Sequence, residues 1–178
     1  MPAAAVITET LIRENINRAV SDVFKTMLGR IPTFVSVTEM SRRDDMAPPP
    51  PGPASGMTTF VVGTVGFLGD INGLIYLCLD EPFARLTTCH LLGLSEAEAM
   101  EAGDEAVNDA IGEITNMTVG SFKNGLCDAG YPCMLTIPSI LRGSNFSIEP
   151  ISSTTRYVYN FESTGHKVAV DILLKGND

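Results

Sequence analysis

The chain has 178 residues, of which 44% are hydrophobic and 19% are charged. These proportions are typical of a folded domain with a sizeable core and exclude a disordered chain. Twelve basic residues against 21 acidic ones leave a net charge of -9. That balance argues against nucleic-acid binding, which needs clustered Lys and Arg, and against electrostatic docking on an anionic membrane.

The sequence also predicts a cytoplasmic protein. No apolar stretch has the ~20 residues of a membrane span, and residues 1–8 lack the basic and apolar regions of a signal peptide. The spacings of Cys78, Cys89, Cys127 and Cys133 match neither a zinc ribbon nor a Cys-x-x-Cys redox motif. The last two are close enough in sequence to meet around a turn, but we expect free thiols because cytosolic disulfides are rare.

The N-terminal part predicts one helix, one strand and a loop. Apolar residues recur at helical spacing over residues 8–29, and Gly29 and Pro32 end the pattern. Residues 34–40 alternate between apolar and polar, as a half-buried strand does. Five prolines and two glycines in residues 42–56 then predict a loop rather than a core element.

Two strands follow. Residues 58–68 and 74–80 are apolar and β-branched, and the turn-forming residues between them predict a hairpin. Gly63, Gly66 and Gly69 lie in or just after the first strand, outside any phosphate-binding motif. We interpret them as strand glycines that relieve close packing.

Helices are expected next. Residues 82–92 predict a short helix. Ser95 followed by Glu98 resembles a capping box that starts a second short helix, which ends near Gly103. A long amphipathic helix follows over residues 104–128.

The C-terminal part predicts four strands, at residues 134–141, 146–151, 155–162 and 167–174, with a turn at 163–166. The order of elements predicts an α+β fold, a two-layer α/β arrangement with helices packed on a mainly antiparallel sheet. Nothing before the loop at 42–56 is large enough to fold alone, so we expect a single domain over residues 1–178.

The long helix has two faces. A helix turns about 100° per residue, which aligns five residues in one apolar stripe: Val107, Ile111, Ile114, Thr118 and Phe122. Asp109, Glu113, Asn116 and Gly120 form a polar stripe on the opposite side. Exposed helix faces are normally polar, so this spacing alone does not assign a function.

Two features favour a function for the polar stripe. Asp and Asn are poor residues for a helix interior, and Gly112 and Gly120 each lower helix stability by ~1 kcal/mol relative to Ala. Glycines beside a polar stripe also let another backbone approach closely, which suits a docking face.

The pattern Asp109-x-x-x-Glu113-x-x-Asn116, followed by a strand that contains Pro138, resembles the signature of the CheC/CheX/FliY chemotaxis phosphatases, and most of all CheX. The hairpin before the helix and the strands after it also fit that family's CheC-like fold. The chain has 21 residues between Asn116 and Pro138, one fewer than the family pattern commonly has. A one-residue deletion in the loop at 128–132 would explain the difference without moving the helix.

The resemblance implies a phosphatase that removes the aspartyl phosphate from a phosphorylated CheY-type receiver protein in chemotaxis or two-component signalling. Asn116 would orient the attacking water and Glu113 would pair with the receiver's active-site lysine, so these two are the expected catalytic residues. Four further residues are expected to bind the partner: Asp109, Gly112, Gly120 and Pro138. The chain would need no cofactor and no metal ligands of its own, because the receiver supplies its Mg2+. A homodimer with contacts at sheet edges is also implied.

Two other functions stay open. The same face would suit a non-catalytic binding or adaptor module for a response regulator or a flagellar switch. A hydrolase with a metal of its own is a third hypothesis. It has little support in the sequence, because His90 and His166 are far apart and we expect them to be a helix-end residue and a turn residue.

Two further Glu-x-x-Asn sequences occur. Glu14 and Asn17 in the first helix resemble the second active helix that some family members carry, although the Asp and Gly of the motif are replaced there. Glu105 and Asn108 lie one turn before the main motif. We interpret this pair as coincidence, because Asn108 points about 80° away from Asn116.

Overall fold

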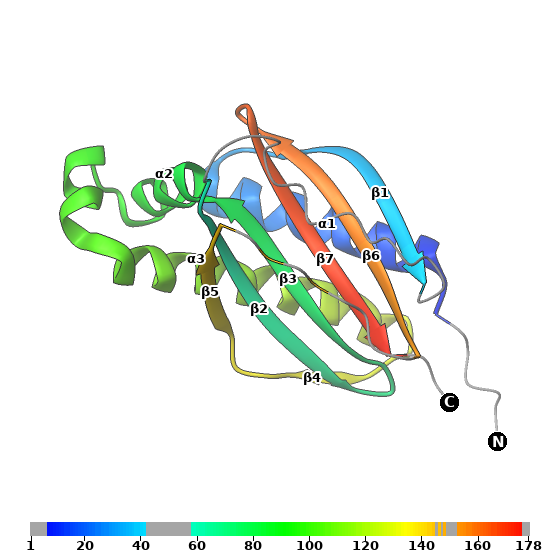
Figure 1. Cartoon of the computed structure of the whole chain (residues 1–178). Coiled ribbons are helices and arrows are strands. Elements are labelled where there is room, and N and C mark those ends of the chain that lie inside the picture. Colours follow the sequence, from blue (N-terminus) through cyan, green and yellow to red (C-terminus); the bar gives the residue numbers. More distant parts are fainter. Residues whose placement is uncertain (1–6, 42–57, 145, 147, 149–152, 176–178) are drawn as a thin grey trace, which may run out of the picture.

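The computed structural model describes residues 7–41, 58–144, 146, 148 and 153–175 (Figure 1). Within these residues, three helices pack on one face of a seven-stranded antiparallel sheet. The α+β fold expected from the sequence is therefore confirmed. The proline-rich loop expected at 42–56 lies outside the described residues.

Local sequence signals set the starts of α1 (Glu9–Leu28) and α2 (Glu81–Leu92). The Thr8 hydroxyl oxygen accepts a hydrogen bond from the backbone N–H of Leu11 at 3.2 Å. The Asp80 carboxylate caps α2 in the same way, at 2.7 Å. Both contacts satisfy backbone groups that a helix N-terminus leaves without a partner, so both helices begin within a residue of the predicted position.

The longest helix, α3 (Glu96–Asp128), bends sharply at Gly103. Its capping box is complete, because the Ser95 hydroxyl accepts from the Glu98 N–H at 3.3 Å and the Glu98 carboxylate accepts from the Ser95 N–H at 2.8 Å. Gly103 has a φ of 72° and a ψ of -169°, which a residue with a side chain rarely adopts. The expected short helix and the helix at 104–128 therefore join into one kinked helix.

All strands within the described residues pair antiparallel, in the order β1-β6-β7-β3-β2-β4, and β5 also pairs with β2. The strands are β1 (Thr33–Ser41), β2 (Phe60–Gly69), β3 (Asn72–Asp80), β4 (Cys133–Leu135), β5 (Ser139–Gly143), β6 (Thr154–Ser163) and β7 (His166–Lys175). The hairpin between β6 and β7 turns at Thr164 and Gly165, with φ values of 53° and 79°. Positive φ at both central residues is the geometry of a tight two-residue turn, and this confirms the predicted hairpin.

One strand prediction was wrong, and another falls mostly outside the described residues. The strand expected at 134–141 is interrupted at 136–138 and continues as a second strand, because Pro138 has no N–H to donate to the ladder on β2. In the segment expected to form a strand at 146–151, positions 146 and 148 belong to no strand. The remainder of that segment lies outside the described residues.

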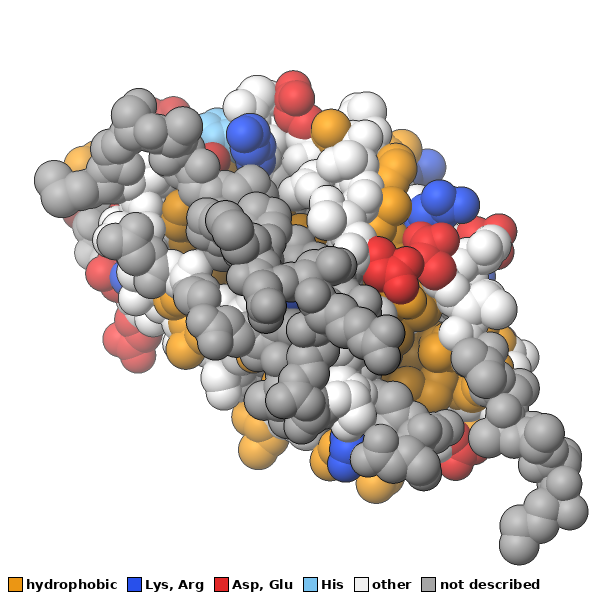
Figure 2. Space-filling model, turned by 45° about the vertical axis from the view of Figure 1, so that its right-hand side comes forward, with side chains coloured by type: hydrophobic (Ala, Val, Ile, Leu, Met, Phe, Trp, Pro, Cys, Tyr) orange, Lys and Arg blue, Asp and Glu red, His pale blue; other side chains and the backbone are white. Residues whose placement is uncertain are grey.

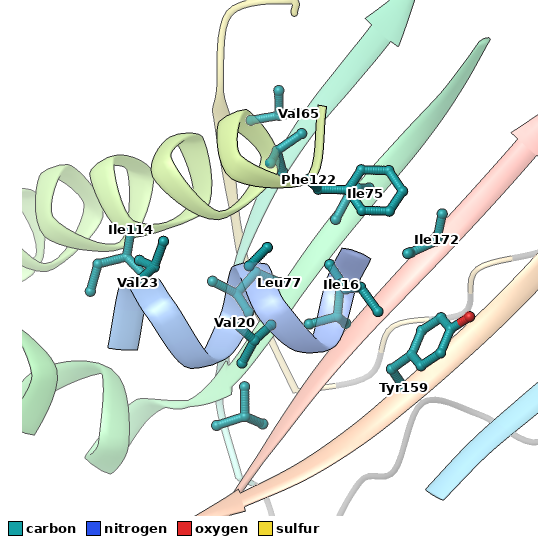
Figure 3. Packing of buried hydrophobic residues seen from close by; sticks show 14 of the residues in the cluster. Ile16, Val20, Val23, Val65, Ile75, Leu77, Ile114, Phe122, Tyr159 and Ile172 are labelled. Carbon is teal, nitrogen blue, oxygen red and sulfur yellow. The ribbon is translucent and has the colours of Figure 1, made fainter. Parts of the chain in front are cut away.

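The core fills the space between the helices and the sheet (Figure 3). Helix and sheet residues meet there in one cluster that includes Ile16, Val20, Ile114, Phe122, Ile75, Leu77 and Ile172. Burying one side chain of this size stabilises a fold by about 1.5–3 kcal/mol. All five residues of the predicted apolar stripe on the long helix are buried, so that prediction is confirmed.

The face of the sheet away from the helices holds a buried ion pair that the sequence did not predict. Arg156 on β6 donates from Nη2 to Asp171 Oδ2 on β7 at 2.6 Å and from Nε at 3.0 Å. The two side chains are 1% and 2% exposed. Burial raises the pKa of the Asp171 carboxyl, against the opposing effect of its hydrogen bond from Arg156.

The distribution of charged side chains on the visible surface fits the excess of acidic over basic residues in the sequence. On the part of the molecule coloured in Figure 2, acidic and basic side chains are interspersed and no large basic patch is seen. No described helix is long and apolar enough to span a membrane.

Candidate functional site

The polar stripe of α3 consists of Asp109, Glu113 and Asn116, with Gly112 and Gly120 beside it. Asp109 and Glu113 are exposed, and Asn116 is half-buried. Within the described residues, none of these three side chains forms an ion pair or a side-chain hydrogen bond, and no polar atom of Asn116 is enclosed. The three polar groups are therefore available to another molecule.

The opposite side of α3 is packed tightly on β2. A Cβ atom added at Gly63 would lie 1.9 Å from Thr115 Oγ1, so only glycine allows this approach. Thr115 and Thr118 are buried, and they donate to the carbonyls of Ile111 and Ile114 at 2.7 and 2.8 Å. Their hydroxyls are thus satisfied within the helix. The interpretation of Gly63 as a glycine that relieves close packing is confirmed.

The edge strand of the sheet runs beside the polar stripe. A Cβ atom added at Gly112 would lie 3.9 Å from Ile140 Cδ1 of β5, and one at Gly120 would lie 4.0 Å from Leu135 Cδ1 of β4. Asn116 lies midway between the two glycines along α3. The interruption between β4 and β5 is therefore at the level of Asn116.

The segment at 136–138, between β4 and β5, is held in place by hydrogen bonds to β2. The Thr136 N–H donates to the Gly66 carbonyl at 2.8 Å, and the Gly66 N–H donates to Thr136 Oγ1 at 2.8 Å. Pro138 is half-buried, whereas Ile137 is 88% exposed. The structure thus brings Pro138 and an exposed apolar side chain close to the polar stripe, and the sequence had singled out Pro138 alone.

A sequence model of the family described as "Chemotaxis phosphatase CheX" matches residues 61–162, more than half of the chain. The chain belongs to this family. The matched residues contain α3 and every site residue predicted above. Glu14 and Asn17 on α1 lie outside them.

Solved structures related to the CheX family have the same fold. A CheC-like superfamily protein from Shewanella sp. PV-4 matches with a TM-score of 0.74 and 22% identity, over 95% of this chain and 100% of that chain. CheX from Desulfovibrio desulfuricans has a TM-score of 0.74 and 20% identity, over 92% and 99% of the two chains. A chain in the CheX–CheY–BeF3–Mg2+ complex from Borrelia burgdorferi has a TM-score of 0.64 and 20% identity, over 92% and 97%. No curated protein matches this chain in sequence.

Beside the stripe of this CheX-family chain lies a charged cluster that the sequence analysis missed. Arg142 on β5 donates to Glu81 Oε1 at 3.2 Å and to Asn108 Oδ1 at 2.9 Å. Arg85 donates to Glu81 at 2.8 Å and to Asp104 at 2.7 Å. The i, i+4 spacing of Glu81 and Arg85 was visible in the sequence, but the contacts between elements were not. Asn108 has a structural partner here, in agreement with its interpretation as a coincidental match to the motif.

The other Glu-x-x-Asn sequence lies on α1. Glu14 is exposed and Asn17 is half-buried, but the side-chain Oδ1 of Asn17 is enclosed and has no hydrogen-bond partner among the described residues. Asn15, two residues before Asn17 and about 160° away from it around α1, is 6% exposed. A Cβ atom added at Gly125 of α3 would lie 2.0 Å from Asn15 Oδ1. α1 therefore packs against α3 on the side of Asn15, and on the side of Asn17 the amide oxygen is enclosed.

The histidines are not part of a candidate site. His90 is exposed in the last turn of α2, as expected for a helix-end residue. His166 is the first residue of β7 rather than a turn residue, with Nδ1 3.0 Å from Asp80 Oδ2 and its ring stacked on Phe83. Among the described residues, no group of three or more His, Cys, Asp or Glu side chains is arranged to hold a metal ion.

Proposed function

We propose that this CheX-family chain is a phosphatase that hydrolyses the aspartyl phosphate of a phosphorylated CheY-type receiver protein. The observation that carries the proposal is that Glu113 and Asn116 point outward from α3 without partners among the described residues. Family membership supports the activity, and the CheY partner in the Borrelia burgdorferi complex supports the substrate class.

Asn116 has the chemistry that the reaction needs. Hydrolysis of an acyl phosphate requires a water molecule in line with the leaving carboxylate oxygen and stabilisation of the developing charge. An amide side chain both donates and accepts hydrogen bonds, so it orients a bound water. Fixing the attacking group in this way lowers the entropic part of the barrier. Asn116 would accelerate the reaction by positioning, with no covalent intermediate on this chain.

Glu113 would set the register of docking. It lies one turn before Asn116 and is exposed. A carboxylate that pairs with the receiver's active-site lysine forms a charge-assisted hydrogen bond. Because Ile114 and Thr115 are buried immediately beside it, the backbone that carries both catalytic side chains is anchored to the core.

The remaining site residues would complete the docking face. Asp109 would either bond to the partner's backbone or support Glu113. Gly112 and Gly120 leave space for a close approach, and Pro138 lies at the strand interruption beside Asn116. The chain would contribute no cofactor, because Mg2+ would arrive with the receiver.

We also propose that the chain is a cytoplasmic homodimer. The β4–β5 edge of the sheet adjoins the proposed site, which leaves β1 as the edge for a contact between copies. Phe34 and Val35 on β1 are 39% and 59% exposed, and an unpaired edge strand is a ready template for such pairing. Light scattering on the purified protein would give the mass, and a monomer at all concentrations would refute the dimer.

The decisive experiment is the decay rate of a phosphorylated CheY-type receiver from the same organism, with and without this protein. We expect acceleration by the wild type and none by a variant with both Glu113→Ala and Asn116→Ala. Both side chains are partly or fully exposed, so the double variant should unfold at the same urea concentration as the wild type. Asn124→Ala is the matched control, an exposed amide two turns further along α3. Full activity in the double variant would end the proposal.

The alternative is a binding or adaptor module that holds the receiver without hydrolysis. The spacing of 21 residues between Asn116 and Pro138 is the observation that favours it, because a small displacement of the amide would remove catalysis and leave docking intact. A pull-down that retains phosphorylated receiver whose decay rate is unchanged would identify this function. Hydrolysis of small phosphate esters without any receiver would instead revive the metal-hydrolase hypothesis.

A further inference from the structure

Two of the four cysteines meet where α3 ends and the edge strand begins. Cys127 is in the last turn of α3, and Cys133 is the first residue of β4. The Cys127 thiol is close enough to act on Cys133, because together with burial it raises the pKa of the Cys133 thiol. Five residues separate them in sequence, so the two thiols close a short loop.

The backbone around this loop keeps the two thiols together. The Gly130 N–H donates to the Cys127 carbonyl at 3.0 Å, and the Asp70 N–H donates to the Pro132 carbonyl at 3.1 Å. Cys133 pairs with Gly69 of β2. A Cβ atom added at Gly69 would lie 2.6 Å from Cys133 Cα, so β2 is in close contact with this residue. These contacts hold the backbone at both ends of the loop, on α3 at Cys127 and on β2 at Cys133.

The two thiols differ in access. Cys127 is half-buried and can be reached from solvent, whereas Cys133 is 7% exposed. Burial raises the pKa of the Cys133 thiol, and the neighbouring Lys123 acts in the opposite direction by favouring the thiolate. Because of this difference in exposure, an external oxidant reacts first with the Cys127 thiol, and the Cys133 thiol reacts second.

Cys127 also lies on the same side of α3 as the polar stripe. It is about five full turns along α3 from Asp109, which gives it the same angular position on the helix. The reachable thiol is therefore at the far end of the polar stripe. The other two cysteines, Cys78 and Cys89, are each 9% exposed and lie on β3 and α2.

We propose that Cys127 and Cys133 are a redox-active pair that a peroxide converts into a disulfide. The Cys127 thiolate attacks one peroxide oxygen, the O–O bond breaks, and Cys127 sulfenic acid and hydroxide form. The Cys133 thiolate then attacks the sulfenic sulfur, the S–S bond forms, and a second hydroxide leaves. The two sulfurs lose two electrons, the peroxide gains them, and the protons of the two thiols complete two water molecules.

The disulfide would join the C-terminal end of α3 covalently to the edge strand. β4 also carries Leu135, which is next to Gly120 of the polar stripe. Oxidation would therefore fix the distance between the helix that carries the stripe and the strand beside it. This pair is independent of the proposed phosphatase activity, since neither thiol is among its catalytic residues.

The test is a thiol map of the reduced, full-length protein after exposure to hydrogen peroxide. The protein is then denatured, treated with N-ethylmaleimide and digested with trypsin. Residues 124–142 form one tryptic peptide that contains both thiols, because Lys123 and Arg142 bound it and no Lys or Arg lies between. We expect most of this peptide to be unlabelled and two hydrogens lighter than the dithiol form, with labelling restored by dithiothreitol. Cys78 and Cys89, on two other tryptic peptides, should stay labelled.

Two variants separate the roles of the thiols. Cys133→Ser should leave Cys127 as a sulfenic acid that dimedone traps, whereas the wild type should give no dimedone adduct. Cys127→Ser should leave Cys133 fully labelled at the same peroxide dose. The proposal is overturned if the wild-type peptide carries two maleimide labels after peroxide treatment. It is also overturned if Cys127 is oxidised further to sulfinic acid while Cys133 stays labelled.

Discussion

Two helices of this protein carry the sequence Glu-x-x-Asn, and the fold surrounds them differently. On α3, Asn116 has no enclosed polar atom and lies between two glycines that leave the helix face open. On α1, the side-chain Oδ1 of Asn17 is enclosed, and Asn15, on another side of the helix, is buried against α3. The same four-residue pattern is an accessible polar face in one helix, whereas in the other its asparagine has an enclosed amide oxygen. A short motif therefore has a docking role only where the packing leaves it open.

The largest expected effect is a direct comparison of the two asparagines. Asn116→Ala should lower the acceleration of receiver dephosphorylation by about 100-fold, because losing the orientation of a reacting group costs a factor of this order. Asn17→Ala should leave the rate within about twofold of wild type, since the side-chain Oδ1 of Asn17 is enclosed and cannot reach a receiver. The measurement is the decay of phosphorylated receiver at matched protein concentrations. An equal loss in both variants would mean that both helices are active and that the comparison fails.

The next effect tests what holds α3 in position. Gly63→Ala should lower the free energy of unfolding by about 2–3 kcal/mol, as overpacking of a core does, because its Cβ would lie 1.9 Å from the buried Thr115 Oγ1. Urea denaturation monitored by circular dichroism would give the value. Unchanged stability would show that α3 is free to move away from β2.

A smaller loss is expected at the crossing of α1 and α3. The Cβ of Gly125→Ala would meet Asn15 Oδ1 at 2.0 Å and Arg18 Nη2 at 2.5 Å. Replacing glycine in a helix gains ~1 kcal/mol, and the crowding costs about 1–3 kcal/mol, so we expect a net loss of about 1 kcal/mol in unfolding free energy. A gain in the same urea experiment would mean that the α1 face is not packed as the structure has it.

The smallest effect on stability should come from Gly120→Ala, on the open face. Its Cβ would have an ordinary contact of 4.0 Å with Leu135 Cδ1, so the better helix propensity should raise the unfolding free energy by up to about 1 kcal/mol. If this face docks a receiver closely, the same variant should bind the receiver several-fold more weakly. A variant that is both more stable and equally tight in binding would remove Gly120 from the docking face.

The elements that could be predicted have local causes. The apolar stripe of α3 was predictable because helical periodicity decides which side chains share a face, and the cap at Ser95 because its partner Glu98 is three residues away. The interruption at 136–138 was not predicted, although Pro138 was visible. A proline signals a missing donor, but whether the strand bends, ends or resumes depends on its neighbour β2.

The sequence by itself determined the helices, most strands, the polar stripe with Asp109, Glu113 and Asn116, and the family that they resemble. Only the tertiary structure decided that the stripe of α3 is open while that of α1 is partly covered. It also decided that Arg142 binds Asn108, that Arg156 and Asp171 are buried together, and that Cys127 and Cys133 meet. The physical reason is the distance along the chain over which each kind of interaction acts. Periodicity and caps act within a few residues, whereas accessibility and pairing depend on which distant segments the hydrophobic core brings together.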